Sequence, residues 1–182
     1  FSHGALMVLR AKKDIRLVTL SSTLISAHEL DFRSVAGGLL VQDKDNQIFS
    51  NQKPVTRRAP TDIETNSLRL ACHVAKHART HAAVIVRGTH TIGIGSGQTS
   101  RLDALRLALV KSQDRHPILP AGLPMVLASD GALSAEHVLD AAQSGITAVI
   151  QPGGTSDDKD AIAACDEKNV AMVFTGVRHF RH

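Results

Sequence analysis

Residues 91–109 read TIGIGSGQTSRLDALRLAL, and their character changes halfway along the stretch. An apolar alternation with glycines at positions 93, 95 and 97 gives way to polar residues and then to leucines at helical spacing. This pattern predicts a strand over Thr91–Gly95 that leads directly into a helix over residues 101–111. A strand followed at once by a helix is typical of α/β folds.

The turn between this strand and this helix is a candidate anion site. The first N–H groups of a helix lack partners within the helix and point beyond the strand tip. We expect Ser100 to cap the helix, with Arg101 beside it as a ligand contact. The glycines either let a ligand approach the backbone or only make a tight bend, with Arg101 a solvated charge. The spacing is not that of a dinucleotide-binding fingerprint.

The rest of the chain continues the alternation of strands and helices, which predicts an α/β fold with a mostly parallel sheet and helices on its faces. We expect one domain over residues 1–182. The segment TDIE at Thr61–Glu64 is a capping box, and Ser134 and Ser156 are expected N-caps of later helices. Strands are expected at residues 15–20, 38–42, 82–86, 125–128, 147–150 and 170–174, helices at 61–79, 134–145 and from 156, and a proline-rich loop at 115–124.

Small or polar residues follow three of the expected strands, as SDG at 129–131, QPGG at 151–154 and TG at 175–176. In open α/β sheets the ligand lies outside the carboxyl ends of the strands, so we expect these residues and the opening stretch to share one rim. Asp130 is either a ligand acceptor or general base, or the cap of a turn. The candidate rim residues are Asp130, Pro152, Gly153 and Gly154.

Composition favours a small anionic ligand over a nucleic acid. Aromatic residues make up 3% of the 182 residues, without Trp or Tyr, which argues against stacking platforms for single strands. The net charge is +4 with dispersed Lys and Arg. Cys72 and Cys165 are expected to be buried free thiols, and the chain has neither a membrane-spanning run nor a signal pattern, so we expect a cytoplasmic protein. Because the sequence opens with Phe1 rather than Met, we expect that upstream residues can be missing.

His73, His77 and His81 follow one another at four-residue spacing beside Cys72, which is compatible with zinc on a helix. The nearby carboxylate of an HExxH site is absent, as is the zinc pattern of cytidine deaminases. We therefore expect no metal, and a buried, hydrogen-bonded His77. The chain also lacks a G-x-S-x-G nucleophile elbow.

The final residues, GVRHFRH at 176–182, place cationic side chains around one aromatic ring. Such a segment could grip a planar anion, or it could be a frayed basic terminus.

Several blocks together resemble a known family, the C-terminal half of aminoimidazole carboxamide ribonucleotide (AICAR) transformylase, which is usually fused to an inosinate cyclohydrolase. The resemblance runs from about Phe32 to the last residue. The blocks are GGLLVQDKD (37–45), VTRRAPT (55–61), VAKHART (74–80), TIGIGSGQTSRLDALRLA (91–108), ASDG (128–131), GITAVIQPGG (145–154) and VAMVFTGVRHFRH (170–182).

This resemblance implies a three-layer, cytidine-deaminase-like α/β fold without zinc, and a homodimer or a complementary transformylase half as partner. It also implies a nucleotide ligand and 10-formyltetrahydrofolate as the formyl donor, with no nucleic acid or membrane partner. Arg101 matches the nucleotide-contacting arginine of the family's GQxSR motif, and His81 stands where the family has an Asn that contacts the nucleotide. The implied binding residues are Gly97, Gln98, Ser100, Arg101, His81, Arg178, Phe180 and His182.

The chain also departs from the family. The family's catalytic Lys-His pair belongs to the other half, and Lys76 and His77 match a different, structural position, so no catalytic residue is assigned here. ALSA at 132–135 replaces an aromatic-proline segment of the folate pocket. Two functions remain open: a domain that contributes to folate-dependent formyl transfer in purine biosynthesis, and a non-catalytic protein that binds a nucleotide or another metabolite.

Overall fold

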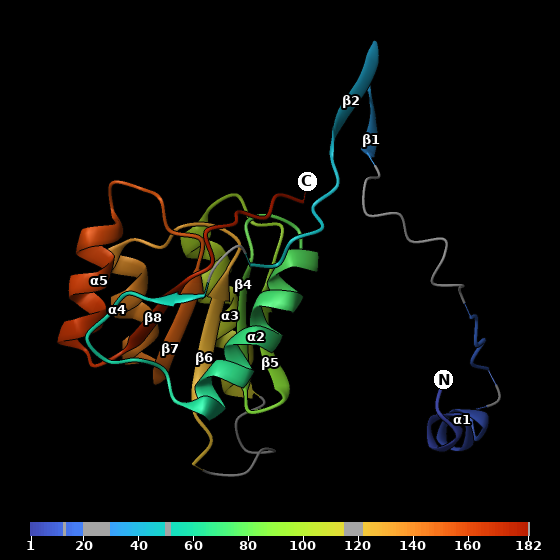
Figure 1. Ribbon diagram of the computed structural model, residues 1–182, viewed down its shortest axis with the longest axis horizontal. Helices are drawn as coiled ribbons and strands as arrows, with labels where there is room; N and C mark the ends of the chain where they lie inside the picture. Colours follow the sequence, from blue (N-terminus) through green and yellow to red (C-terminus); the bar gives the residue numbers. More distant parts are fainter. Residues whose placement is uncertain (13, 20–29, 50–51, 115–121, 182) are drawn as a thin grey trace. The chain divides into compact units, whose positions relative to one another are not determined.

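The computed structural model describes residues 1–12, 14–19, 30–49, 52–114 and 122–181. Contacts divide the chain into two compact units, Phe1–Asn46 and Gln47–His182. Figure 1 shows the helices and strands of both units. The prediction of a single domain over residues 1–182 stays a prediction, because a division by contacts does not show whether the two units fold independently.

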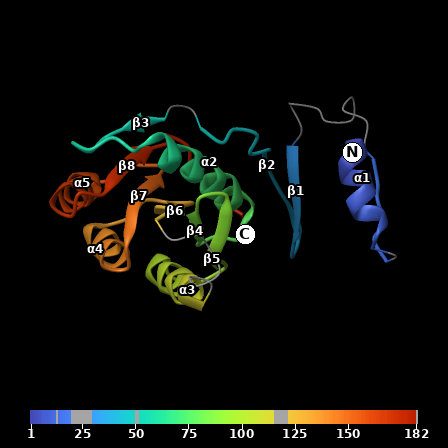
Figure 2. The same ribbon diagram turned by 90° about the horizontal axis from the view of Figure 1, so that it is seen from below.

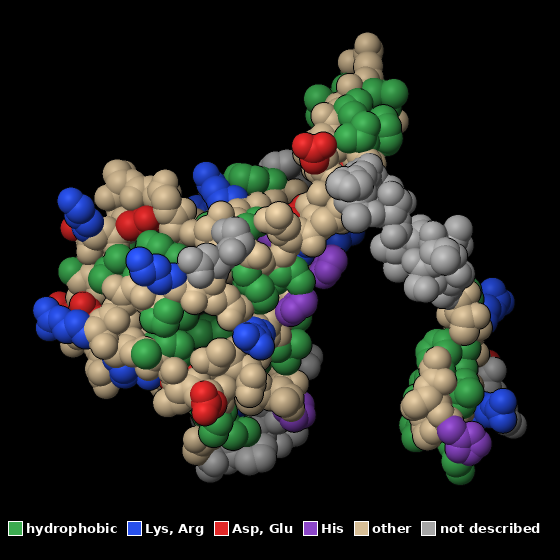
Figure 3. Space-filling model, in the orientation of Figure 1, with side chains coloured by type: hydrophobic (Ala, Val, Ile, Leu, Met, Phe, Trp, Pro, Cys, Tyr) green, Lys and Arg blue, Asp and Glu red, His purple; other side chains and the backbone are tan. Residues whose placement is uncertain are grey.

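The first unit contains a short helix, α1 (His3–Arg10), and a hairpin of β1 (Leu30–Val35) and β2 (Gly38–Asp43). The hairpin confirms the strand predicted at 38–42, whereas the described residues 15–19 form no strand. The antiparallel register pairs Phe32 with Val41, so these side chains share one face of the hairpin. Apolar side chains gather over it and are exposed within this unit (Figure 3).

The second unit is built on a six-stranded sheet with the order β3-β8-β7-β6-β4-β5. Only the β6–β7 and β7–β8 pairings are parallel among the described strands, so the expectation of a mostly parallel sheet is wrong and the sheet is mixed. The reason lies partly in the two-residue turn after Arg87, where Gly88 has a φ of +58° and reverses the chain into an antiparallel neighbour. The strands are β3 (Lys53–Pro54), β4 (Ala83–Arg87), β5 (His90–Gly95), β6 (Met125–Ser129), β7 (Ile146–Gln151) and β8 (Ala171–Phe174).

Helices cover both faces of this sheet, which gives three layers (Figure 2). Side chains alternate along β4: Val84 and Val86 pack in the cluster under α2 (Asp62–His77), whereas Ala83 and Ile85 pack in the cluster under the other helices. A strand buried on both faces reads as a continuous apolar run, as this one does. The helices on the second face are α3 (Arg101–Asp114), α4 (Ala135–Gln143) and α5 (Asp158–Glu167).

The predicted capping box of α2 is confirmed. The Thr61 hydroxyl accepts from the Glu64 N–H at 3.3 Å, and the Glu64 carboxylate accepts from the Thr61 N–H at 2.8 Å. Ser134 is the N-cap residue of α4, as predicted, and its N–H donates to His137 Nδ1 at 2.9 Å. Both helices therefore begin where the sequence indicates.

The start of α5 differs from the prediction that Ser156 caps it. The Asp158 carboxylate accepts from the N–H groups of Gly154 at 2.7 Å and Thr155 at 3.3 Å. The Ser156 hydroxyl instead donates to Asp157 at 3.1 Å. A charged carboxylate is the stronger acceptor for backbone N–H groups, so the turn closes on Asp158.

A buried ion pair ties α2 to the sheet. The Arg58 guanidinium donates to both oxygens of Glu64, at 2.8 and 3.0 Å, and the Thr147 hydroxyl of β7 donates to the same carboxylate at 2.6 Å. Burial acts to raise the pKa of Glu64, but the hydrogen bonds from Arg58, Thr147 and Thr61 outweigh it and lower the pKa to about 2.

Candidate anion-binding site at the carboxyl edge of the sheet

Four strands of the second unit end at one edge of the sheet, which we call the carboxyl edge. Ala83, at the start of β4, pairs with Gly95 at the end of β5 and with Ser129 at the end of β6. The parallel strands β7 and β8 end at this edge as well. The segments that follow these strands, including the start of α3, therefore meet at this edge.

The C-terminal segment crosses the carboxyl edge, from one strand end to the next (Figure 1). The Gly176 N–H donates to the Pro152 carbonyl at 3.1 Å, and the His179 N–H donates to the Asp130 carbonyl at 3.3 Å. Further along, the Arg181 carbonyl accepts from the Thr80 N–H at 3.0 Å. Residues 176–181 are thus tied to the sheet rather than frayed, while His182 lies outside the described residues.

Arg101 is half-buried at this edge and has specific neighbours. Its Nη2 lies 3.2 Å from His81 Nδ1. Its guanidinium packs against Gly131, where an added Cβ would lie 2.6 Å from the guanidinium carbon. Among the described residues, neither the Nε of Arg101 nor the two carboxylate oxygens of the buried Asp130 have a hydrogen-bond partner. Two of the predicted site residues, His81 and Arg101, therefore lie in direct contact.

Charges of both signs act on the guanidinium of Arg101. Burial lowers the pKa of Arg101 below its usual value, the negative charge of Asp130 opposes this, and the positive charge of Arg178 adds to it. The pKa of His137 is lowered by burial and by the charge of Arg101. Asp130, Arg178 and His137 therefore lie close enough to the guanidinium of Arg101 for electrostatic interaction.

Two further residues of this edge, His137 and His179, were not among the residues that the sequence indicated. His137 occupies the third position of α4, and nothing in its local spacing marks it. His179 is buried between the exposed Arg178 and Phe180. The alternation of the tail could have indicated this, because neighbouring residues of an extended segment point to opposite sides.

Arg178 and Phe180, which the sequence analysis predicts as ligand contacts, touch each other. The guanidinium carbon of Arg178 lies 4.8 Å from the centre of the Phe180 ring, within the range of cation–π attraction. Arg178 also lines a hollow of about 440 Å³ with the predicted rim residues. The described residues that line this hollow are Lys53, Pro152, Gly153, Gly154, Phe174, Gly176 and Arg178.

The glycines of the opening stretch have roles other than ligand approach. A Cβ at Gly95 would lie 2.6 Å from the carbonyl carbon of Ala104, and one at Gly93 would lie 3.0 Å from that of Ala108. Both positions let the backbone of α3 pack directly on β5. Gly97, with φ +66°, makes the bend, and its N–H donates to the Arg79 carbonyl at 2.8 Å.

Ser100 caps α3 as predicted: its hydroxyl accepts from the Asp103 N–H at 3.0 Å and donates to the Asp103 carboxylate at 2.7 Å. The first turn thus already carries its own carboxylate, which disfavours a second anion at the backbone itself. The Gln98 carbonyl accepts from the His81 N–H at 3.4 Å and so holds the backbone of a predicted contact. The side chain of Arg101 is the better candidate for an anion.

His77 is exposed, so the expectation that it is buried is wrong. It lies at the last position of α2 and lines a shallow hollow with His73, Ile94 and Ser96 rather than the core. The helix ends there, and the side chain of His77 stays exposed, whereas Leu68 of the same helix is buried. In the parts of the chain that the structure describes, no three His, Cys, Asp or Glu residues are grouped so that they could hold a metal ion.

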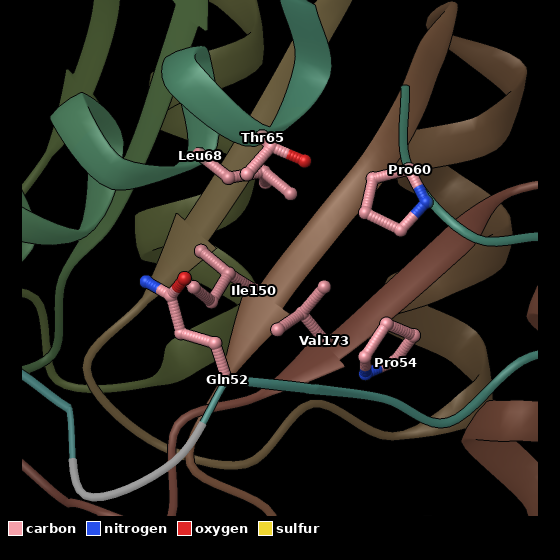
Figure 4. Close-up of a pocket in the computed structure, with 7 residues that line it drawn as sticks. All are labelled: Gln52, Pro54, Pro60, Thr65, Leu68, Ile150 and Val173. Carbon is pink, nitrogen blue, oxygen red and sulfur yellow. The ribbon is translucent and has the colours of Figure 1, made fainter. Parts of the chain in front are cut away.

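A third hollow, of about 70 Å³, lies between α2 and the sheet (Figure 4). Thr65 and Leu68 of α2 face Ile150 and Val173 of the sheet there, and Pro54 and Pro60 complete the walls with Gln52. The lining carries no charge and contains none of the predicted site residues. This hollow is therefore not a candidate for the anion.

Over the described ranges, the structure has no helix that is both long and apolar enough to cross a membrane.

Comparison with known proteins supports the resemblance. The family model described as "AICARFT/IMPCHase bienzyme" matches residues 1–111. The "Bifunctional purine biosynthesis protein PurH" of Brucella ovis and that of Brucella canis are each 44% identical over an alignment of 189 positions, which covers all of this chain and 35% of the relative. The similarity thus begins before Phe32, and the chain spans about a third of the length of these curated relatives.

Among solved structures, a variant of NE0047 in complex with 8-azaguanine is similar with a TM-score of 0.43 and 16% identity, over 71% of this chain and 82% of that one. NE0047 in complex with 2,6-diaminopurine is similar with a TM-score of 0.40 and 15% identity, over 66% of this chain and 76% of that one. The match to the family model and the identity to the PurH proteins decide the assignment. The chain belongs to the AICARFT/IMPCHase bienzyme family.

Proposed function

We propose that the carboxyl edge of the second unit binds an AICAR-type nucleotide and contributes to formyl transfer in purine biosynthesis. The observation that carries the proposal is the half-buried Arg101, in contact with His81 and within electrostatic reach of Arg178. A guanidinium that is partly removed from water attracts an anion more strongly than a solvated one. The PurH relatives are named as purine biosynthesis proteins, which supports the same pathway.

In this proposal the edge positions and neutralises the substrate. Arg101 binds the anionic group of the nucleotide, and the tail segment with Arg178 and Phe180 covers its planar base. The formyl donor is 10-formyltetrahydrofolate, the fold is of the cytidine-deaminase-like kind, and the protein acts as a homodimer or with a complementary half. Proton transfer falls to residues outside this chain, because the family's catalytic Lys-His pair belongs to the other half. Lys76 donates to the Gln47 carbonyl at 2.9 Å, in keeping with a structural role.

A non-catalytic binding protein is the second candidate, and one observation favours it. Leu133, within the segment that replaces the aromatic-proline stretch, is fully buried, and its N–H donates to the Gln151 side chain. The next residue, Ser134, caps α4. Both residues thus serve the fold, which favours a chain that binds the nucleotide without the folate.

Calorimetric titration with the AICAR nucleotide, and separately with a folate analogue, distinguishes the two candidates. Binding of both supports the transformylase role, binding of the nucleotide alone supports the second candidate, and binding of neither contradicts both.

The role of Arg101 is tested by Arg101→Ala. The loss of a charge-assisted hydrogen bond is expected to weaken nucleotide binding by about 1–3 kcal/mol, roughly 5- to 150-fold. Arg106→Ala is the matched control, since Arg106 lies on the same helix, is exposed and pairs with Asp140 at 3.7 Å. An unchanged dissociation constant in Arg101→Ala would reject the assigned role.

A further inference from the structure

Two histidines near the end of α2 line one hollow and have no part in the proposed function. His73 and His77 lie four residues apart on this helix, both are exposed, and Ile94 of β5 lines the same hollow. We propose that the two imidazoles form a binding site for a divalent transition-metal ion, with Cu²⁺ preferred over Zn²⁺. The site goes beyond the proposed function, because it contains none of the residues assigned to the nucleotide.

The exposure of His77 removes one reason to expect no metal. That expectation rests partly on a buried His77, whose imidazole would be enclosed by the core, whereas the structure places it exposed at the last position of α2. His81, the third histidine of the four-residue series, follows the end of the helix, and its Nδ1 lies 3.2 Å from Arg101. The series therefore divides into a helical pair and a residue of the carboxyl edge.

Helical spacing allows the two imidazoles to bind one ion. Side chains four residues apart on a helix are neighbours, with Cβ atoms about 5–6 Å apart, and a histidine pair at this spacing binds zinc in metalloproteases. Leu68, Ala71 and Ala75 are buried, so the helix that carries the pair is fixed on the sheet. The ring of Phe49 meets the ring of His73 edge-on, with centres 6.1 Å apart. The pair thus stands on a rigid element, and one of its rings has an aromatic neighbour.

The surroundings of the pair favour a metal that prefers nitrogen ligands. Among the described residues, none that lines the hollow is acidic, and no third His, Cys, Asp or Glu joins the pair. Two cations belong to the same region: Lys76 precedes His77 and donates to the Gln47 carbonyl at 2.9 Å, and Arg181 donates to the His77 carbonyl at 3.3 Å. Mg²⁺ and Ca²⁺ prefer oxygen ligands, which the pair does not offer. Imidazole suits Cu²⁺, Ni²⁺ and Zn²⁺, and Cu²⁺ binds most tightly of the three.

A pair of protein ligands leaves further coordination positions of the ion open. The hollow, of about 490 Å³, has room for water at these positions. Structural zinc sites use four protein ligands, so the pair suits an exchangeable ion rather than one that holds the fold together.

The test is calorimetric titration of the full chain with Cu²⁺, Zn²⁺ and Mg²⁺ in a buffer that does not bind metals. Every chain carries His3→Gln, so that a histidine close to the amino group of Phe1 does not compete for the ion. We expect Cu²⁺ to bind more tightly than Zn²⁺, and Mg²⁺ not to bind. His73→Gln and His77→Gln should each weaken Cu²⁺ binding by at least about tenfold, because the second imidazole then no longer adds an intramolecular contact to the same ion.

The control keeps the number of histidines on α2 and changes their spacing. Asn66 is exposed on this helix, seven residues before His73 and so about 10 Å away along the axis. The double variant Asn66→His, His77→Gln therefore has two histidines that cannot share an ion, and it should bind Cu²⁺ as weakly as His77→Gln alone. Circular dichroism checks that each variant is folded.

The proposal is overturned if the double variant binds Cu²⁺ as tightly as the chain with both His73 and His77. Cu²⁺ binding that neither single substitution weakens would overturn it as well, because the ion then lies elsewhere. Binding of Zn²⁺ or Mg²⁺ as tight as that of Cu²⁺ would contradict the nitrogen-ligand site.

Discussion

At the scale of single residues, the buried carboxylate of Glu64 stabilises both the start of α2 and the contact of this helix with the sheet. Its carboxylate completes the capping box with Thr61, receives both arms of the Arg58 guanidinium and accepts from Thr147 of β7. Arg58 also donates from Nε to the Asn169 carbonyl at 2.9 Å, ahead of β8. One ion pair thus connects the start of α2 with two strands. The sequence predicts the capping box, but the partner of Glu64 in Arg58 depends on the fold.

Stability should depend on pH through Glu64. Its folded pKa of about 2 lies below its usual 4.5, so the contribution is fully present above pH 4.5 and is lost as the pH falls through 2. The size is about 3 kcal/mol for a shift of this magnitude. Urea unfolding between pH 7 and pH 2 should show this decline in the original chain and a smaller one in Glu64→Gln.

Glu64→Gln should also unfold more easily at pH 7, by about 2–3 kcal/mol, because Arg58 loses its buried counter-charge. Glu136→Gln, an exposed acid in the first turn of α4, is the control and should change the free energy of unfolding by less than about 0.5 kcal/mol. Equal effects of both variants would contradict the role given to the ion pair.

At the scale of elements, the contact between β5 and α3 determines where Arg101 lies. Gly95 leaves no room for a side chain, because a Cβ would meet the backbone of Ala104 rather than a movable side chain. Gly95→Ala should therefore push α3 away from the sheet and lower the free energy of unfolding by on the order of 3 kcal/mol. Urea unfolding measures this, and anion binding should weaken with it.

Gly38→Ala is the control for this prediction, since a Cβ at position 38 has no atom within 4 Å. Its effect on the free energy of unfolding should be small. If Gly95→Ala is as stable as Gly38→Ala, direct packing of the helix on the strand is not required.

The turn before α5 gives a second prediction at this scale. Asp158→Ala should lower the free energy of unfolding by about 1–2 kcal/mol, because the N–H groups of Gly154 and Thr155 lose their acceptor. Ser156→Ala should change it by less than about 0.5 kcal/mol, since its hydroxyl contacts only the exposed Asp157 among the described residues. Thermal or urea unfolding of the two variants compares them directly, and the reverse order would restore Ser156 as the cap.

At the scale of the whole molecule, both buried clusters and all residues of the carboxyl edge belong to the second unit. We therefore expect a chain of residues 47–182 to fold and to bind the same anions as the full chain. Circular dichroism, cooperative urea unfolding and the calorimetric titration with the AICAR nucleotide measure this. Non-cooperative unfolding of the shortened chain would show that residues 1–46 contribute to the stability of the second unit.

The sequence by itself determined the class of the fold and most helix starts. Apolar periodicity and capping residues such as Thr61 act over a few neighbouring positions, so they can be recognised without the rest of the chain. It also indicated that Arg101 and the tail lie at the same edge, because strand ends share a side in α/β sheets. Glycines that precede a helix, however, have the same appearance whether they serve a ligand or close packing.

Only the tertiary structure decided the direction of the strands, the exposure of His77 and the partners of Arg101. The antiparallel pairings of β3 with β8 and of β4 with β6 join segments far apart in the sequence, whereas β4 and β5 form a local hairpin. The same long-range pairing brings Lys53 to Arg178 and Arg58 to Thr147. Contacts of this kind arise when the core closes, because burial of both sheet faces selects one arrangement among many that satisfy the local pattern equally well.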